Sequence, residues 1–257
     1  MTQTFDPADL PRALDDKTWL LVLTGAGVSA ESGLPTFRAS DGLWENHHIE
    51  DVASPDGFRR DPELVWRFYG ERRAGAAKVE PNAGHLALAE LERRLGERFL
   101  LVTQNVDGLH GRAGSRRYVE LHGSLWRTRC SSCDLVPFDD HSHPVEPPLP
   151  MCPNCGALLR PDIVWFGEAI PYHGDFAVRE HIYLARLAKE RLVFLAAGTS
   201  GNVWPASSYV SRAADAGAET WLADPGVPAN RGAFDRHLRG PATVVLPALV
   251  EAFKPSA

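Results

Sequence analysis

Short apolar runs alternate along this chain with stretches in which apolar residues recur every three or four positions. We expect strands at residues 19–23, 99–103, 118–121, 192–197, 220–223 and 243–246. Most of these runs are apolar on both faces, which is typical of parallel strands covered by helices on both sides. The pattern therefore predicts an α/β fold with a mainly parallel sheet. The crossover between the second and third strands is too short to hold a long helix.

Two helices carry clear start signals. An Asp-Pro-Glu run at residues 61–63 supplies an N-cap, a proline at the first helical position and an acid in the first turn. It predicts a helix over residues 64–77. Residues 82–95 begin at an asparagine, carry leucines at three- and four-residue spacing and end at Gly96. Residues 203–216 show a weaker helical pattern.

Two segments do not fit the sheet. Residues 37–60 are polar and aromatic without a clean period, which indicates a long functional loop. Residues 125–160 contain all four cysteines and many prolines. This composition predicts a small second domain that a metal ion organises.

The cysteine spacing identifies that metal. Cys130-x2-Cys133 is followed, after 18 intervening residues, by Cys152-x2-Cys155. Two such knuckles complete a tetrahedral zinc site, and four sulfurs leave no position for water. We therefore expect a structural zinc. Four buried free cysteines or two disulfides are the alternatives, and His141 and His143 are further candidate ligands in what we interpret as a solvated loop.

Composition narrows the class of protein. At 257 residues, 44% hydrophobic and 23% charged, the chain has the size and composition of one globular domain or of a domain with a small satellite. No apolar run approaches the roughly 18 residues of a membrane span. The formal net charge of −6 argues against nucleic acid and anionic membrane as partners. We expect a cytoplasmic monomer.

A glycine-rich turn follows the first predicted strand. Gly25, Gly27 and Ala30 fit GxGxxG/A, in which backbone N–H groups approach a phosphate at a helix N-terminus. A tight turn without a ligand is the alternative. No second strand with an acid at its tip follows at about 20 residues, as a dehydrogenase would require. The loop therefore predicts nucleotide binding of another kind.

The turn continues as GAGVSAESGLPTFR, from Gly25 to Arg38. Further motifs follow in order: TQNVDGLH from Thr103, ELHG from Glu120, the cysteine knuckles, PDIVWFGE from Pro161, and GTS from Gly198. Together they resemble the sirtuins, NAD-dependent protein-lysine deacylases, over nearly the whole chain. The resemblance implies a discontinuous Rossmann-like NAD-binding domain of residues 1–37, 82–124 and 161–257, a cofactor loop and helical insertion at residues 38–81, and a zinc-binding small domain at residues 125–160.

The resemblance also implies the chemistry. The family cleaves the nicotinamide–ribose bond of NAD and transfers the acyl group from lysine to ADP-ribose. His122 matches the family's general base, a task that suits imidazole because its pKa lies near operating pH. A hydrogen-bonded core histidine is the alternative. The implied NAD contacts are Gly25, Ala26, Gly27, Ser29, Glu31, Pro35, Phe37, Arg38, Gln104, Asn105, Asp107, Gly198, Thr199, Ser200 and Ala242.

Some of these matches can also be explained by a purely structural role. Asn105 and Asp107 can form a turn after a strand, and residues 198–200 can be a plain strand-ending turn. One position departs from the family: by alignment Leu222 replaces an asparagine and Asp224 a glutamate of the element that touches the adenine-side ribose. That contact is therefore in doubt, although we expect NAD binding to survive.

The predicted helix at residues 64–77 carries Tyr69 and Arg72 three positions apart, so they share a face. The pair resembles the Tyr-x-x-Arg of sirtuins that prefer succinyl- and malonyl-lysine, because a guanidinium can fork onto the distal carboxylate. An amphipathic helix with a solvated Arg72 is the alternative. Arg73 points elsewhere, which suggests that Arg73→Met leaves activity unchanged.

The substrate partner implied by the resemblance is an acylated protein lysine. Val164, Trp165 and Phe166 resemble the segment that pairs with the substrate backbone. Three other functions stay open: an ADP-ribosyltransferase or NAD hydrolase on the same fold, an NAD sensor without turnover, and a zinc-ribbon nucleic-acid adaptor. The acidic charge argues against the adaptor, and His122 argues against the sensor.

Overall fold

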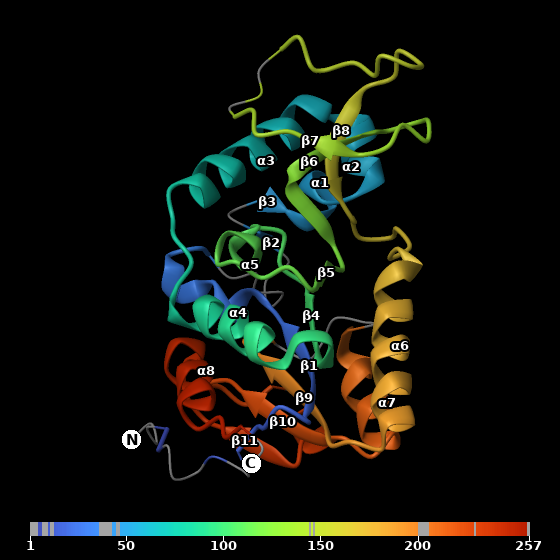
Figure 1. The fold of residues 1–257 in the computed structure, drawn as a ribbon. Helices are drawn as coiled ribbons and strands as arrows, with labels where there is room; N and C mark the ends of the chain where they lie inside the picture. Colours follow the sequence, from blue (N-terminus) through green and yellow to red (C-terminus); the bar gives the residue numbers. More distant parts are fainter. Residues whose placement is uncertain are drawn as a thin grey trace.

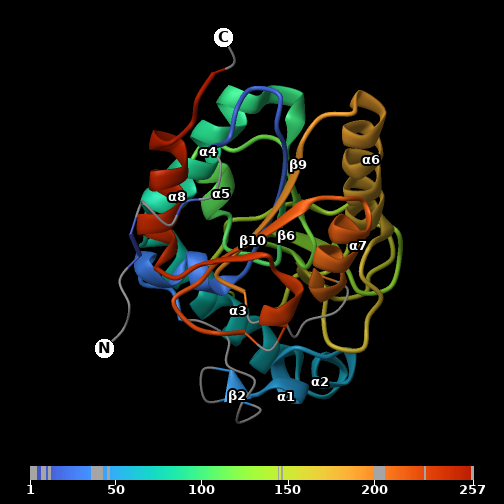
Figure 2. The same ribbon diagram turned by 90° about the horizontal axis from the view of Figure 1, so that it is seen from below.

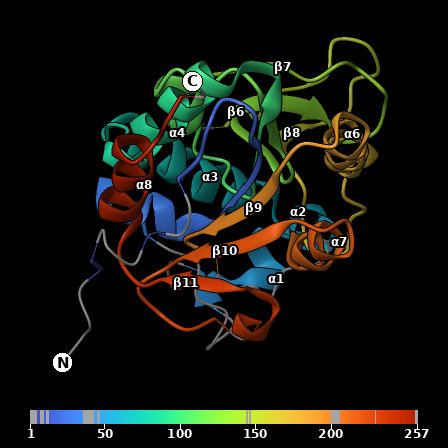
Figure 3. The same cartoon turned by 60° about the horizontal axis from the view of Figure 1, so that its bottom comes forward.

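The computed structural model describes residues 5–6, 10, 13–35, 43–44, 47–143, 145, 147–199, 206–228 and 230–255. Six strands form its central sheet: β1 (Trp19–Thr24), β4 (Phe99–Thr103), β5 (Tyr118–Glu120), β9 (Leu192–Ala197), β10 (Glu219–Ala223) and β11 (Arg236–Leu238). They pair in parallel in the order β11-β10-β9-β1-β4-β5. Figure 3 shows β9, β10 and β11 side by side. The predicted α/β fold is confirmed, and a four-residue helix, α5 (Leu109–Arg112), lies in the compact crossover between β4 and β5.

Helices cover both faces of the sheet because each central strand is apolar on both sides. Leu20 and Val22 of β1 belong to the core under α4 (Ala83–Leu95) and α8 (Ala242–Glu251). The alternate residues Leu21 and Leu23 belong to the core under α6 (Tyr172–Ala188) and α7 (Tyr209–Asp215). The two helix layers lie on opposite sides of the strands in Figure 2. This layering follows from the period-2 direction of strand side chains.

The start signals of the two clearest helices are confirmed. Asp61 accepts a hydrogen bond from the Leu64 amide at 2.9 Å and begins α3 (Pro62–Ala77). Asn82 accepts from the amides of Gly84 and His85 and begins α4. Of the weaker prediction at 203–216, residues 201–205 lie outside the described part, and α7 forms within the remainder.

One predicted strand is wrong, and two elements were not predicted. Residues 243–246 belong to helix α8 rather than to a strand, because Val245, Leu246 and Leu249 dock on α4 at helical spacing. Tertiary packing here overrides the strand preference of a β-branched run. The sixth strand is β11 instead, and the 17-residue helix α6 was not expected.

Residues 37–60 are also more ordered than a loop in their described part. They hold a two-residue antiparallel pair, β2 (Leu43–Trp44) with β3 (His47–His48), and the helices α1 (Ile49–Val52) and α2 (Pro55–Arg60). Ser54 caps α2 by accepting from the Gly57 amide at 2.9 Å.

A second lobe stands above the carboxyl end of the sheet (Figure 1). We call residues 47–78 and 123–163 the upper lobe; it joins α1–α3 to an antiparallel sheet of β6 (Gly123–Cys130), β7 (Phe138–Asp139) and β8 (Leu159–Ile163) in the order β7-β6-β8. Its own apolar core includes Trp66, whose indole N–H donates to the Leu159 carbonyl at 3.0 Å. Among the described residues, no helix is both long and apolar enough to cross a membrane. The proposed domain boundaries stay a prediction.

Candidate active site

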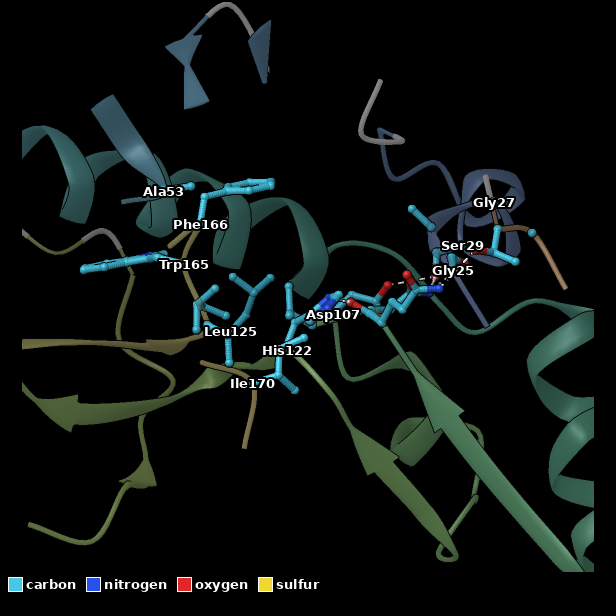
Figure 4. Close-up of a pocket in the computed structure, with 18 of the residues that line it drawn as sticks. Gly25, Gly27, Ser29, Ala53, Asp107, His122, Leu125, Trp165, Phe166 and Ile170 are labelled. Atoms are coloured by element: carbon cyan, nitrogen blue, oxygen red, sulfur yellow. Dashed lines mark hydrogen bonds between the residues drawn. The ribbon is translucent and has the colours of Figure 1, made fainter. Parts of the chain in front are cut away.

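A cleft of about 1510 Å³ separates the sheet from the upper lobe. The loops that follow β1, β4, β5, β9 and β10 form one wall, where parallel sheets generally bind ligands. The other wall comes from α3 and the segment after β8. Figure 4 shows His122 between these walls, with Gly25, Ser29 and Asp107 on one side and Trp165 and Phe166 on the other.

Glycines let the loops after β1 and β9 touch. A Cβ on Gly25 would lie 2.7 Å from the Gly198 carbonyl oxygen, and a Cβ on Gly198 would lie 2.4 Å from the Val28 nitrogen. Gly198 also adopts a φ of 58°, in the left-handed region. The Gly27 amide donates to the Gly198 carbonyl at 2.9 Å. The glycine turn therefore holds a specific backbone shape beside the cleft, with Ala26, Pro35 and Thr199 also lining it.

A buried hydrogen-bond network holds the polar groups of this wall. The Ser29 hydroxyl donates to the Asp107 carboxylate at 2.8 Å and accepts from the Asn105 amide at 3.2 Å. His85 Nε2 lies 3.3 Å from the same hydroxyl, while its Nδ1 accepts from the Asn82 amide. Desolvation lowers the pKa of His85, against the opposing charge of Asp107. The network therefore holds the Asp107 carboxylate and the Asn105 side-chain amide in place at the cleft. The neutral His85 ring supports it through the Ser29 hydroxyl.

His122 is oriented by a backbone group. Its Nδ1 lies 3.1 Å from the carbonyl oxygen of Gln104, which can only accept, so Nδ1 carries the proton. Nε2 is then the unprotonated nitrogen and can take a proton. Burial lowers the pKa of His122, and the hydrogen bond to Gln104 offsets part of that shift. The Gln104 side chain in turn donates to the Thr199 hydroxyl at 3.1 Å. This arrangement leaves Nε2 of a cleft-lining histidine able to accept a proton.

The opposite end of the cleft presents a phenol and a guanidinium. Tyr69 is fully buried, and desolvation raises its pKa to about 12. Its oxygen accepts from the Trp165 indole N–H at 3.1 Å, so the phenol proton is available for donation into the cleft. Arg72 is half-buried, lines the cleft with Tyr69 and lies 5.6 Å from the centre of the Phe68 ring.

Arg73 does lie on another face, but it is not a neutral control. Its side chain is fully buried and donates to the Leu125 carbonyl at 2.6 Å and to Asp140 at 2.9 Å. Further bonds reach the Ser142 and Arg127 carbonyls and the Thr128 hydroxyl. Arg73 thus ties α3 to the small sheet, so we expect Arg73→Met to lower stability, while its effect on activity stays a prediction.

The segment predicted to meet a substrate backbone lies along the cleft. The amides of Val164 and Phe166 already donate to the carbonyls of His122 and Ala53 at 3.0 and 2.9 Å. The Trp165 amide donates to the Glu168 carboxylate at 2.8 Å. A peptide strand that docks here must therefore donate its own N–H groups to carbonyl oxygens.

The structure does not bring every predicted residue to the cleft. Glu31 lies at the surface, where its carboxylate accepts from the Thr243 hydroxyl at 2.6 Å, and Ala242 is buried at the start of α8. Neither lines the cleft. Phe37, Arg38 and Ser200 lie outside the described residues.

The structure also settles which residue after β10 reaches the cleft. Leu222 is fully buried in the core of the sheet, so it does not occupy a ligand-contacting position. Asp224, the first residue after the strand, lines the cleft, and desolvation raises its pKa. The rule that ligands bind at the carboxyl ends of parallel strands could have identified Asp224. His85 and the Trp165–Tyr69 contact carried no comparable sequence signal.

The four cysteines come together in the upper lobe. All four Sγ atoms lie within 4.8 Å of one another, which suits a tetrahedral ion with Zn–S bonds of about 2.3 Å. The amides of Cys133 and Ser132 donate to the Cys130 sulfur and lower its pKa to about 6, which favours the thiolate that zinc requires. None of the cysteines lines the cleft. The residues therefore fit a structural zinc remote from the reacting groups.

The comparisons with known proteins agree with this site. The model of the Sir2 family matches residues 25–205. An NAD-dependent protein deacylase 2 of Pyrobaculum aerophilum is 48% identical, over 91% of this chain and 90% of the relative. An NAD-dependent protein deacylase of Pyrococcus furiosus is 42% identical, over 96% and 97%.

Solved structures give the same result. A Sir2 homologue–NAD complex superposes with a TM-score of 0.81 at 44% identity, over 90% of this chain and 88% of that one. A complex of Sir2, p53 peptide and NAD⁺ gives 0.72 at 29% identity, over 90% and 92%. The six-stranded parallel sheet, the cleft with His122 at its centre and these matches together place the chain in the Sir2 family, the sirtuins.

Proposed function

We propose that this chain is an NAD-dependent protein-lysine deacylase that prefers succinyl- and malonyl-lysine and also accepts acetyl-lysine, with His122 as its general base. Membership of the Sir2 family and relatives named as deacylases support the enzyme class. One observation supports the finer assignment: His122, Tyr69 and Arg72 line a single cleft.

The wall formed by the sheet suits NAD. The glycine turn and Gly198 expose backbone at the cleft, where phosphate groups can approach. Asn105 and Asp107, held by Ser29, offer an amide and a carboxylate to ribose hydroxyls and to the nicotinamide amide. At the far end Asp224 can accept from hydroxyls of the adenine-side ribose.

His122 lies between this wall and the upper lobe, where an acyl-lysine would enter. Its Nε2 can accept the proton of a ribose hydroxyl as that hydroxyl attacks the acyl carbon. Nδ1 keeps its proton, donates it in a hydrogen bond to the Gln104 carbonyl and so holds the ring in this orientation. The side chains of Val106, Leu125 and Ile163 line the same cleft and reduce access of water.

Tyr69 and Arg72 would select the acyl group. A distal carboxylate can accept from the phenol proton, which Trp165 leaves available, and from the guanidinium. An acetyl group offers no acceptor at this position. The zinc would hold the knuckles of the upper lobe together and would take no part in bond cleavage, since the cysteines lie outside the cleft.

The test is nicotinamide release from NAD without peptide, with an acetyl-lysine peptide and with a succinyl-lysine peptide. We expect the succinyl peptide to stimulate release most, and His122→Tyr to abolish the stimulated release. O-Succinyl-ADP-ribose should appear in equal amount. Release that ignores both peptides would instead identify an NAD hydrolase or ADP-ribosyltransferase and would contradict the proposal.

A further inference from the structure

The outer face of α6 carries large apolar side chains in solvent. Tyr172, Phe176, Tyr183 and Leu187 are 68%, 53%, 63% and 66% exposed. The helix runs along one edge of the molecule, with one side packed on the sheet and the other side outward (Figures 1 and 2). Monomeric proteins rarely expose several large apolar side chains on one face of a helix. We call these four residues the α6 stripe.

The stripe is separate from the part of α6 that stabilises the fold. Val178, His181 and Ala185 are buried on the side facing the sheet. At about 100° per residue, these three and the stripe lie on opposite sides of the helix. Tyr183 follows Tyr172 by 11 positions, as Leu187 follows Phe176, and an 11-residue spacing keeps side chains on one line of a straight helix. The stripe therefore faces away from the sheet along the helix; Tyr172 at its start also lines the cleft, whereas Phe176, Tyr183 and Leu187 do not.

We propose that a second copy of this chain covers the α6 stripe, with the two α6 helices parallel about a two-fold axis. The charges beside the stripe support a second copy as the partner and determine the relative direction of the two helices. Arg179 and Glu180, both exposed, flank the stripe on opposite sides at mid-helix, and Arg179 also pairs with Asp175 of its own helix at 2.6 Å. In a parallel pair, Arg179 of each copy faces Glu180 of the other. In an antiparallel pair, Arg179 would face Arg179, and Glu180 would face Glu180. Like charges across the interface would disfavour that second arrangement.

The stripe has the area for a weak, specific contact. If all eight side chains of the two copies are covered, the buried surface is on the order of 1,000 Å², near the lower limit for specific interfaces. Stacked aromatic pairs of Tyr172, Phe176 and Tyr183 would add to that burial. Association should therefore depend on concentration, and the chain should be monomeric in dilute assays.

Sedimentation from about 5 to about 500 µM tests the proposal, a range that brackets weak transient affinities. We expect the mass to rise from 28.2 kDa toward twice that value. Phe176→Arg should stay monomeric throughout while keeping its circular dichroism and its activity. Leu86→Arg, at another exposed apolar residue on α4, is the matched control and should associate like the unaltered chain. A chain that stays monomeric, or a dimer that Phe176→Arg leaves intact, would overturn the proposal.

Two further measurements test the direction of the helices. Glu180→Arg should weaken association at least about fivefold, and salt should then strengthen it, because screening removes the repulsion from Arg179 of the other copy. Leu187→Cys should form a disulfide-linked dimer on mild oxidation, since a parallel two-fold places this position beside its copy. In an antiparallel pair the two sulfurs would be more than about 20 Å apart. A dimer without this cross-link would refute the parallel arrangement.

Discussion

Replacing Arg72 by methionine should separate the two deacylase activities. The substitution removes the guanidinium but keeps an unbranched apolar side chain on α3. Arg72 lines the cleft and is half-buried, so a carboxylate bound there exchanges only part of its water for the guanidinium. Each charge-assisted hydrogen bond contributes about 1.5–3 kcal/mol, and a forked pair could supply two.

Partial exposure reduces the sum of two bonds, so we take about 3 kcal/mol for the whole contact. At about 1.4 kcal/mol per factor of ten, kcat/KM for a succinyl-lysine peptide should fall about 100-fold. For an acetyl-lysine peptide it should change less than about threefold, because acetyl presents no charge for Arg72 to contact. Arg72→Lys should lie between these limits, since an ammonium keeps the charge without the planar fork.

The assay is nicotinamide release at several concentrations of each peptide, with saturating NAD. Arg67→Met is the matched control, because Arg67 is an exposed arginine of the same helix that does not line the cleft. Equal losses toward both peptides in Arg72→Met would refute the carboxylate contact. They would show instead that Arg72 supports the cleft as a whole.

Four further predictions follow from the same geometry. Trp165→Phe removes the indole donor but keeps a ring, so KM for the succinyl peptide should rise about 3- to 10-fold while the acetyl peptide is little affected; equal effects on both would indicate a packing defect. Because burial lowers the pKa of His122, its ring stays unprotonated below the usual imidazole pKa. The midpoint of the acidic limb in the pH profile of kcat/KM should therefore lie below about pH 6.5. A midpoint above about pH 7 would contradict this. Arg73→Met should lower the free energy of urea unfolding by about 3–5 kcal/mol, since it leaves buried acceptors and Asp140 without their partner; a change below about 1 kcal/mol would be inconsistent with that network. Burial disfavours the charged forms of His110 and His181 and lowers their pKa values to about 3 and about 4. The unfolded chain therefore binds more protons below about pH 6.5, and stability should fall as pH drops from there toward 4. Equal unfolding midpoints at about pH 7 and about pH 5 would rule this out.

Local signals in the sequence were sufficient to predict where two helices begin and that the cysteines form a cluster. Asp61 and Asn82 begin helices because their side chains satisfy amides within the next few residues, a relation that needs no tertiary contact. The cysteine pairs bring four sulfurs together because each knuckle is a short-range turn. His122 was identified differently, from the resemblance of the ELHG motif to the family, because a single histidine at the end of a strand carries no such signal by itself.

The failures share a different cause. The strand predicted at residues 243–246 is part of helix α8, because Val245 and Leu246 pack on α4, a partner far away in sequence. Helix α6 was missed since its outer aromatic residues blur the one-sided apolar pattern of an ordinary surface helix. Arg73 was expected only to lie on another face of its helix from Arg72, yet β6 and the loop after β7 enclose it.

The sequence by itself determined the sheet class, the helix starts, the cysteine cluster and the identity of many of the groups that line the cleft. These depend on residue type and short spacing. The tertiary structure decided that Asp224 rather than Leu222 reaches the cleft, that Trp165 orients Tyr69, and that α6 keeps an exposed apolar face. Each of these depends on which distant segments meet, and a local pattern does not specify that.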